Sequence, residues 1–176
     1  MTLSRFIVRQ TIGGGVINAV LNGPVAIVIM REDTTWHLWR GFPSLVLDIL
    51  GVAFGIAWGT GWLFTPQLRK QIASGRLVAP EVPASWRVAF SQWPASSMHR
   101  GINLGGLAVL VFALPTIAAL FWLGVESWGR WPVIAFKTAF GLVIGAVFTP
   151  LVAASVLAEP PPVIEAIAPV EERLEG

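Results

Sequence analysis

Four long apolar segments set the strongest limit on what this chain can fold into. They cover residues 12–30, 43–64, 102–123 and 132–157. Each has close to the ~20 residues that an α-helix needs to cross the hydrocarbon core of a bilayer. Because backbone N–H and C=O groups find no water there, a spanning segment must pair them internally, as a helix does. We therefore expect an all-α protein, built as a bundle of four transmembrane helices.

Composition agrees with a membrane protein. Of the 176 residues, 55% are hydrophobic and 12% are charged, and the mean hydropathy is +0.70. This is about half the charge of a typical soluble domain. The net charge of +2, with no basic stripe, argues against binding of nucleic acid. The absence of cysteine excludes disulfides, thiolate metal ligands and a cysteine nucleophile.

The chain divides into a membrane part and a short tail. Residues 1–158 form the expected four-helix domain, with a long loop at 67–100 between the second and third segments. Residues 159–176 contain three consecutive prolines, and five glutamates against one arginine. Such a composition is typical of a solvated extension. The sequence leaves open whether this tail is ordered.

Lysines and arginines are divided unequally between the two sides of the expected bundle. The N-terminus, the 67–100 loop and the tail hold eight of them, whereas the opposite loops hold three. Cytoplasmic loops of membrane proteins carry the excess of these residues. We therefore expect a multi-pass protein of the bacterial inner membrane, in contact with the lipid bilayer and with both termini in the cytoplasm.

Two charged residues lie inside the apolar segments, Asp48 in the second and Lys137 in the fourth. An unpaired charge at the centre of a membrane helix costs about 2.5–3.5 kcal/mol even on insertion scales. We therefore expect an ion pair that clamps the second helix to the fourth. Two alternatives stay open: Asp48 binds a proton or a cation, or both side chains extend to the membrane surface.

Glycines are spaced four residues apart in the same two segments. Gly51, Gly55 and Gly59 share one face of the second helix, and Gly141 and Gly145 share one face of the fourth. Faces without side chains let two membrane helices approach closely. The two glycine faces are therefore expected to pack against each other below the ion pair.

A weak internal repeat relates the two halves of the chain. Phe-Thr-Pro occurs at 64–66 and at 148–150, and Ala-Phe-Gly occurs at 53–55 and at 139–141. The two copies would be helix pairs that repeat in the same direction.

Two amides lie on one face of the first segment, at Asn18 and Asn22. Asparagine is costly in hydrocarbon unless it bonds to another helix, a contact worth about 0.5–2 kcal/mol. We interpret the pair as a helix-packing contact, with contact to a substrate or an ion as the alternative.

Groups for catalysis are sparse. His37 and His99 fall on opposite sides of the expected bundle, so they cannot share a metal ion or a proton relay. No Ser-His-Asp set can be assembled either. We therefore expect no enzyme, no catalytic site, no metal and no cofactor, whereas a bound lipid, pigment or quinone stays open.

The order of these features resembles small four-span bacterial inner-membrane proteins of unknown function that are sometimes labelled permeases. The likeness covers about residues 12–158. The residues that carry it are Asn18 and Asn22, Asp48, the exit Thr65-Pro66-Gln67-Leu68-Arg69-Lys70 with Gly75-Arg76-Leu77, Arg100-Gly101, and Lys137 with Thr149-Pro150. The resemblance implies a membrane bundle and supplies no activity.

These observations favour a non-catalytic accessory or assembly subunit of a larger membrane complex, with an energy-converting complex, such as a photosynthetic or respiratory one, as one candidate. Its partners would be other integral membrane subunits, docking on Trp86 and Trp93 of the loop and on Ile164 and Ile167 of the tail. The alternative is a small homo-oligomeric transporter or channel. Its path would be lined by the intramembrane polar residues Asn18, Asn22, Asp48 and Lys137.

Overall fold

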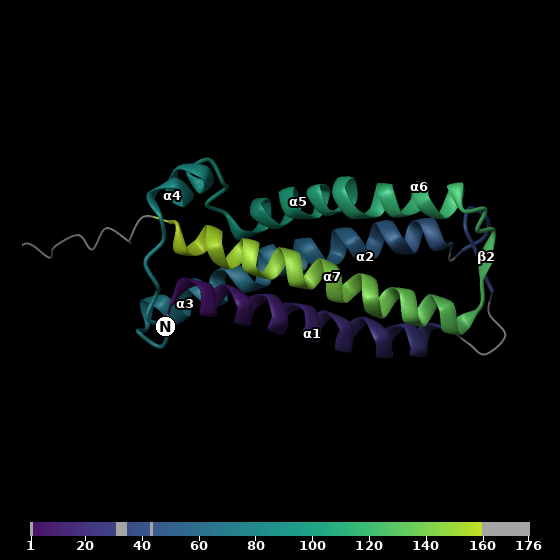
Figure 1. The fold of residues 1–176 in the computed structure, drawn as a ribbon, viewed down its shortest axis with the longest axis horizontal. Helices are drawn as coiled ribbons and strands as arrows, with labels where there is room; N and C mark the ends of the chain where they lie inside the picture. The colour runs from purple at the N-terminus through teal and green to yellow at the C-terminus, as the bar shows by residue number, and fades with distance from the viewer. Residues whose placement is uncertain (1, 31–34, 43, 160–176) are drawn as a thin grey trace, which may run out of the picture.

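The structure is a computed structural model that describes residues 2–30, 35–42 and 44–159 of the chain. Helices make up most of it, and a pair of two-residue strands lies at one end (Figure 1). The elements in chain order are α1 (Leu3–Ile29), β1 (Trp36–His37), α2 (Leu45–Gly59), η1 (Thr60–Phe64), α3 (Thr65–Ala73), α4 (Ala84–Phe90), α5 (Ser97–Ala108), η2 (Val109–Ala113), α6 (Leu114–Trp122), β2 (Ser127–Trp128) and α7 (Arg130–Leu157).

Four helical stretches run along the bundle: α1, α2–η1–α3, α5–η2–α6 and α7. Each is long and apolar enough to cross a membrane. The predicted all-α bundle of four long apolar helices is confirmed. The first helix begins at Leu3 rather than at residue 12, so it also carries Arg5 and Arg9.

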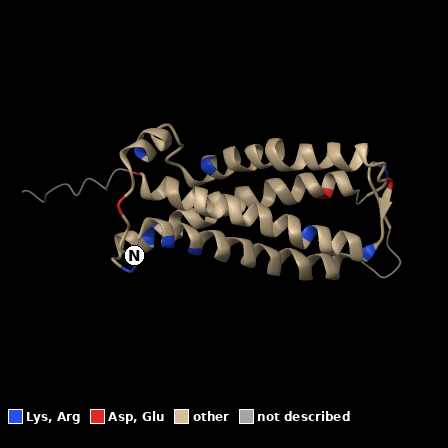
Figure 2. Ribbon diagram, in the orientation of Figure 1, with Lys and Arg blue, Asp and Glu red and all other residues tan. Residues whose placement is uncertain are grey.

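The bundle has two distinct ends. The N-terminus, α3, α4 and the last turn of α7 lie at one end, which we call the loop end (Figure 1). The strands lie at the other end, which we call the ribbon end, where Trp36 pairs with Trp128 and His37 with Ser127. Figure 2 shows most charged residues at these two ends and few between them. This distribution keeps charge out of the part that hydrocarbon would surround.

The packing order of the four stretches is not the order of the chain. The first, α1, lies along the last, α7, and α5 lies along α2, while α2 and α7 meet between them (Figure 1). By contrast, α1 and α2 scarcely touch each other. In the expected parallel repeat, the first two stretches form one pair and the last two form the other. The observed order fits that repeat, because the first helix of each pair packs on the second helix of the other pair.

Two turns of π-helix interrupt the second and third stretches. Pro66 follows η1 and Pro115 follows η2, each at the second position of the next α-helix. Proline has no N–H, and its ring collides with the carbonyl four residues earlier in a regular α-helix. The wider π-turn relieves that collision. The other Phe-Thr-Pro copy behaves differently, because α7 continues through Pro150 as an α-helix.

Glycines provide close helix contacts at two interfaces. Between α5 and the second stretch, a Cβ atom built on Gly61 would lie 2.6 Å from the Cα of Gly101. Between α1 and α7, a Cβ atom on Gly14 would collide with the Thr149 side chain, and one on Gly145 would lie 2.5 Å from Nδ2 of Asn18. A methyl group cannot fit at any of these three positions without movement of a helix.

The expected contact between the two glycine faces is not formed. Gly141 and Gly145 are buried, but the helix that covers them is α1 rather than α2. Nothing lies within 4 Å of a Cβ atom built on Gly51, Gly55 or Gly59. The four-residue spacing identified both faces, but α1 occupies the face on α7, so the face on α2 remains uncovered.

Candidate functional site

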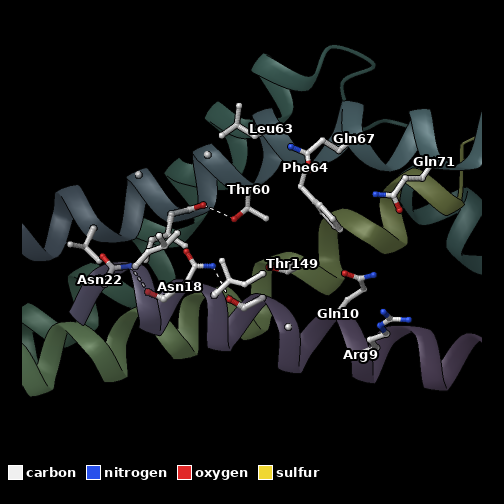
Figure 3. A pocket seen from close by; sticks show the side chains of 18 of the residues that line it. Arg9, Gln10, Asn18, Asn22, Thr60, Leu63, Phe64, Gln67, Gln71 and Thr149 are labelled. Carbon is white, nitrogen blue, oxygen red and sulfur yellow. Dashed lines mark hydrogen bonds between the residues drawn. The ribbon is translucent and has the colours of Figure 1, made fainter. Parts of the chain in front are cut away.

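A groove lies between α1 and the second helical stretch, with Thr149 of α7 contributing to its lining, and we call it the α1–α2 groove (Figure 3). It has a volume of about 1040 Å³. Its lining extends along the second stretch from Leu47 to Gln71, a rise of about 36 Å at 1.5 Å per residue. The polar residues that line it are Arg9, Gln10, Asn18, Asn22, Asp48, Thr60, Gln67, Gln71, Arg76 and Thr149.

The uncovered glycine face of α2 forms part of the groove wall. Gly51, Gly55 and Gly59 all line it. Because glycine carries no side chain, a ligand can approach the α2 backbone more closely at these three positions than it could if any other residue type stood there. The helix-packing role predicted for these three glycines is therefore not what the structure shows.

The two asparagines lie on the opposite wall. The Nδ2 atom of Asn18 donates to the carbonyl of Gly14 at 2.8 Å, and that of Asn22 donates to the carbonyl of Asn18 at 2.8 Å. Both side chains also cover the glycine face of α7. Their amide oxygens have no hydrogen-bond donor among the described residues. The groove therefore contains acceptor oxygens at membrane depth.

Asp48 and Lys137 are joined in an ion pair near the ribbon end of the groove. The Nζ atom of Lys137 donates to Oδ1 of Asp48 at 2.5 Å. Lys137 is 3% exposed, and its Nζ atom also lies 5.4 Å from the centre of the buried Trp36 ring. The ion pair joins α2 to α7, as expected from the sequence, and the Lys137 side chain does not extend to the surface. Asp48 also lines the groove, and its binding of a proton or cation stays a prediction.

The loop end of the groove carries positive charge and amides. Arg9 and Gln10 come from α1, Gln67 and Gln71 come from α3, and Arg76 follows α3 (Figure 3). We call these five residues the groove mouth. Neither arginine has an acidic partner within the described parts of the chain. The groove thus presents hydrogen-bond donors and positive charge at its mouth and acceptors at depth.

A second polar cluster at the loop end was not identified from the sequence. Glu159 accepts two hydrogen bonds from Arg69, both at 2.8 Å, and one from Arg100 at 2.6 Å. Arg100 is 2% exposed and also donates to Ser155 at 3.0 Å and to the carbonyl of Pro94. Burial alone would raise the pKa of Glu159, but the hydrogen bonds and charges of the two arginines lower it below the ordinary 4.5.

The sequence signal for this cluster was present but incomplete. Arg100 stands at the start of the third apolar segment and Glu159 just after the fourth. Charged residues are common at the ends of membrane segments, so these two positions gave no sign that Arg100 and Glu159 would pair. The cluster ties α3, α5 and the end of α7 together and does not line the groove.

Serine and histidine are absent from the groove lining within the described residues. His37 lies in β1 at the ribbon end, whereas His99 lies in α5 at the loop end. Ser155 donates to the carbonyl of Val152, and no described serine is hydrogen-bonded to either histidine. The described residues therefore do not form a Ser–His pair.

The predicted docking residues are only partly described. Trp86 and Trp93 each pack edge-on against Phe90 in and after α4. Ile164 and Ile167 lie outside the described residues. A docking role for these four side chains stays a prediction.

Comparison with known proteins gives one match. The chain is 26% identical over 117 residues to the rhomboid protease GlpG of Yersinia enterocolitica, a match that covers 65% of this chain and 38% of GlpG. The chain thus spans well under half the length of that relative. No family model matches the sequence, and no solved structure matches it.

This similarity corrects four of the expectations above. The resemblance to small four-span proteins of unknown function is wrong, because the match is to a rhomboid protease. The non-catalytic accessory subunit, its transporter alternative and the expectation of no enzyme are wrong for the same reason. The accessory-subunit and transporter inferences rested on intramembrane charges, asparagines and glycines, residue types that help to pack many membrane bundles whatever their activity. The expectation of no enzyme rested on the separation of His37 and His99 and on the lack of a Ser-His-Asp set.

Proposed function

We propose that this chain is a rhomboid-like membrane protein that binds a membrane-embedded segment of another polypeptide in the α1–α2 groove. The observation that carries the proposal is a long groove with acceptor oxygens at membrane depth, between two helices that scarcely touch. A segment could enter from the bilayer through that gap.

The polarity of the groove favours a polypeptide over an acyl chain. A backbone that unwinds in hydrocarbon has N–H groups that need acceptors. The amide oxygens of Asn18 and Asn22 and the carboxylate of Asp48 provide them. An acyl chain would leave the two asparagine oxygens buried and unpaired, which costs about 1–3 kcal/mol per group.

Peptide-bond hydrolysis is the second candidate function, and the similarity to GlpG favours it, since that protein is named a protease. A polar groove is a place where a peptide bond and water can meet inside the bundle. Incubation of the reconstituted protein with a tagged single-span protein, followed by gel analysis, tests this directly. Two shorter fragments are the expected result, and a fully intact substrate after prolonged incubation would contradict it.

We also propose that the loop end faces the bacterial cytoplasm. Arg5, Arg9 and the basic residues of the 67–100 loop gather there, as the positive-inside rule requires (Figure 2). Reporter fusions to the N-terminus and to residue 125, at the ribbon end, test this orientation. The N-terminal fusion should report a cytoplasmic location and the internal one a periplasmic location.

Site-specific crosslinking tests the binding proposal. A photoreactive amino acid replaces Leu63, which lines the groove, and in a separate variant replaces Leu110, which faces away on η2. Both leucines are exposed, at 53% and 63%, so they form a matched pair. Irradiation in liposomes with a single-span peptide should label that peptide from position 63. Equal labelling from both positions would mean that the peptide contacts the bundle without using the groove.

A further inference from the structure

The groove mouth is the part of the groove whose charges have no acidic partner among the described residues. Elsewhere at the loop end, Arg69 and Arg100 share the carboxylate of Glu159. Arg9 and Arg76 have no such partner among the described residues, although both line the groove. Two guanidinium groups on different elements, with Gln10, Gln67 and Gln71 beside them, offer many donors to one anion.

We propose that the polypeptide segment bound in the groove carries a carboxylate side chain at the end that lies between Arg9 and Arg76. The inference rests on the proposed function and names the class of its ligand: apolar segments flanked by Asp or Glu. The ligand is held by its backbone at depth and by its acidic residue at the mouth.

The opposite end of the groove gives the ligand a direction. Asp48 lines the groove near the ribbon end and is already paired with Lys137. A second carboxylate there would meet a negative charge, and no further cation among the described residues lines that end of the groove, which makes the contact unfavourable at low dielectric. An Asp or Glu at one end of the bound segment therefore binds favourably at the groove mouth and unfavourably at the ribbon end.

An anionic lipid headgroup has the same chemistry as a carboxylate at the mouth. Its acyl chains, however, would have to lie along the groove against Asn18, Asn22 and Asp48. The polypeptide is favoured because its backbone can pair with those side chains. The lipid is therefore treated as a competing outcome of the experiment.

The experiment measures the affinity of fluorescent single-span peptides for the full chain in phosphatidylcholine nanodiscs. One peptide carries Glu at one end of its span and Gln at the other, and a second carries Gln at both ends. The Glu peptide can therefore bind with its single Glu at the mouth and no carboxylate at the ribbon end. The Glu peptide should bind about tenfold more tightly. This preference should fall about threefold with Arg9→Gln or Arg76→Gln and disappear in the double variant, because both side chains are exposed and each pair is weak.

Arg87→Gln is the matched control. Arg87 is an exposed arginine of α4 at the same end of the bundle, and it does not line the groove. This variant should keep the full preference for the Glu peptide. A double variant Arg9→Glu/Arg76→Glu should instead prefer a peptide with Lys at both ends, a reversal that altered folding would not produce. Unfolding midpoints from tryptophan fluorescence check that every variant is folded.

The outcomes separate the inference from the proposed function. If the wild-type chain binds neither peptide, the proposed function fails. If it binds both peptides equally, the acidic-flank inference fails while binding in the groove stands. A third outcome is a preference for the Glu peptide that survives in Arg9→Gln/Arg76→Gln, while phosphatidylglycerol added to the nanodiscs binds the wild-type chain but not this double variant. That result would assign the mouth to lipid and overturn the inference.

Discussion

At the scale of single residues, the sequence was most informative where an isolated feature carried a large energetic cost. A lysine and an aspartate inside apolar segments each need a partner, so their mutual contact followed from sequence positions alone. Arg100 and Glu159 lie at segment ends, where a charge can also be solvated. Their contact could not be predicted, because nothing required it.

The Asp48–Lys137 pair gives a prediction about stability. Lys137→Met leaves the carboxylate unpaired, and Asp48→Asn leaves the lysine unpaired, each inside the bundle. Each change should lower the free energy of unfolding by about 2–3 kcal/mol, somewhat below the usual cost of breaking a fully buried pair, because Asp48 lines the groove. The double variant should recover much of the loss. Unfolding in mixed micelles measures this, and a double variant as unstable as the sum of the singles would exclude a clamp.

Glu159 gives a prediction about pH. Its folded pKa lies below the ordinary value of 4.5, so its contacts with Arg69 and Arg100 stabilise the fold fully above that pH. The contribution is lost as pH falls through the lower, folded pKa. Glu159→Gln should therefore have a lower unfolding midpoint than the wild type at pH 7, and the gap should narrow on acidification below about pH 4.5. A gap that is constant from pH 7 to pH 3 would contradict the assigned contact.

At the scale of elements, periodicity located faces but did not assign their neighbours. The spacing of Gly141 and Gly145 correctly marked a face that another helix covers, but that helix is α1. The same spacing at Gly51, Gly55 and Gly59 marks a wall of the groove. A smooth face is equally suited to a helix of the same chain and to a ligand, so the pattern alone could not distinguish them.

The two glycine faces therefore respond differently to the same substitution. Gly145→Leu drives a side chain into α1 and should lower the free energy of unfolding by about 3 kcal/mol. Gly55→Leu projects into the open groove and should cost nothing or stabilise α2 slightly, because leucine is the better helix former. Both are measured by the unfolding assay used for the ion pair. Equal destabilisation by the two changes would place a helix over both faces.

At the scale of the whole molecule, hydropathy was enough to predict four spanning helices and an all-α fold. It could not predict that α1 packs on α7 and α5 on α2, since any pairing of four apolar helices satisfies the same composition. The groove was missed for a related reason. It exists because α1 and α2 do not pack together, and an absent contact leaves no periodic signal in either segment.

The function was harder to predict from the sequence than the fold or the packing of the helices. The reasoning from residue types excluded an enzyme because His37 and His99 lie at opposite ends, and the structure places them there. The similarity to a rhomboid protease nevertheless overturns that conclusion. The groove is compatible with both the separated histidines and the similarity to a protease. It brings polar side chains into the membrane-spanning part of the bundle, and none of the described residues that line it is a histidine.

The affinity of the Gly55→Leu variant for a single-span peptide in nanodiscs tests the central claim most directly. The added side chain projects into the groove between α1 and α2, where a Cβ atom at position 55 has nothing within 4 Å. The account predicts that this variant stays folded and loses at least tenfold in affinity, whereas Leu110→Ala on the far side keeps wild-type affinity. Wild-type affinity in a folded Gly55→Leu variant would show that the groove is not the binding site.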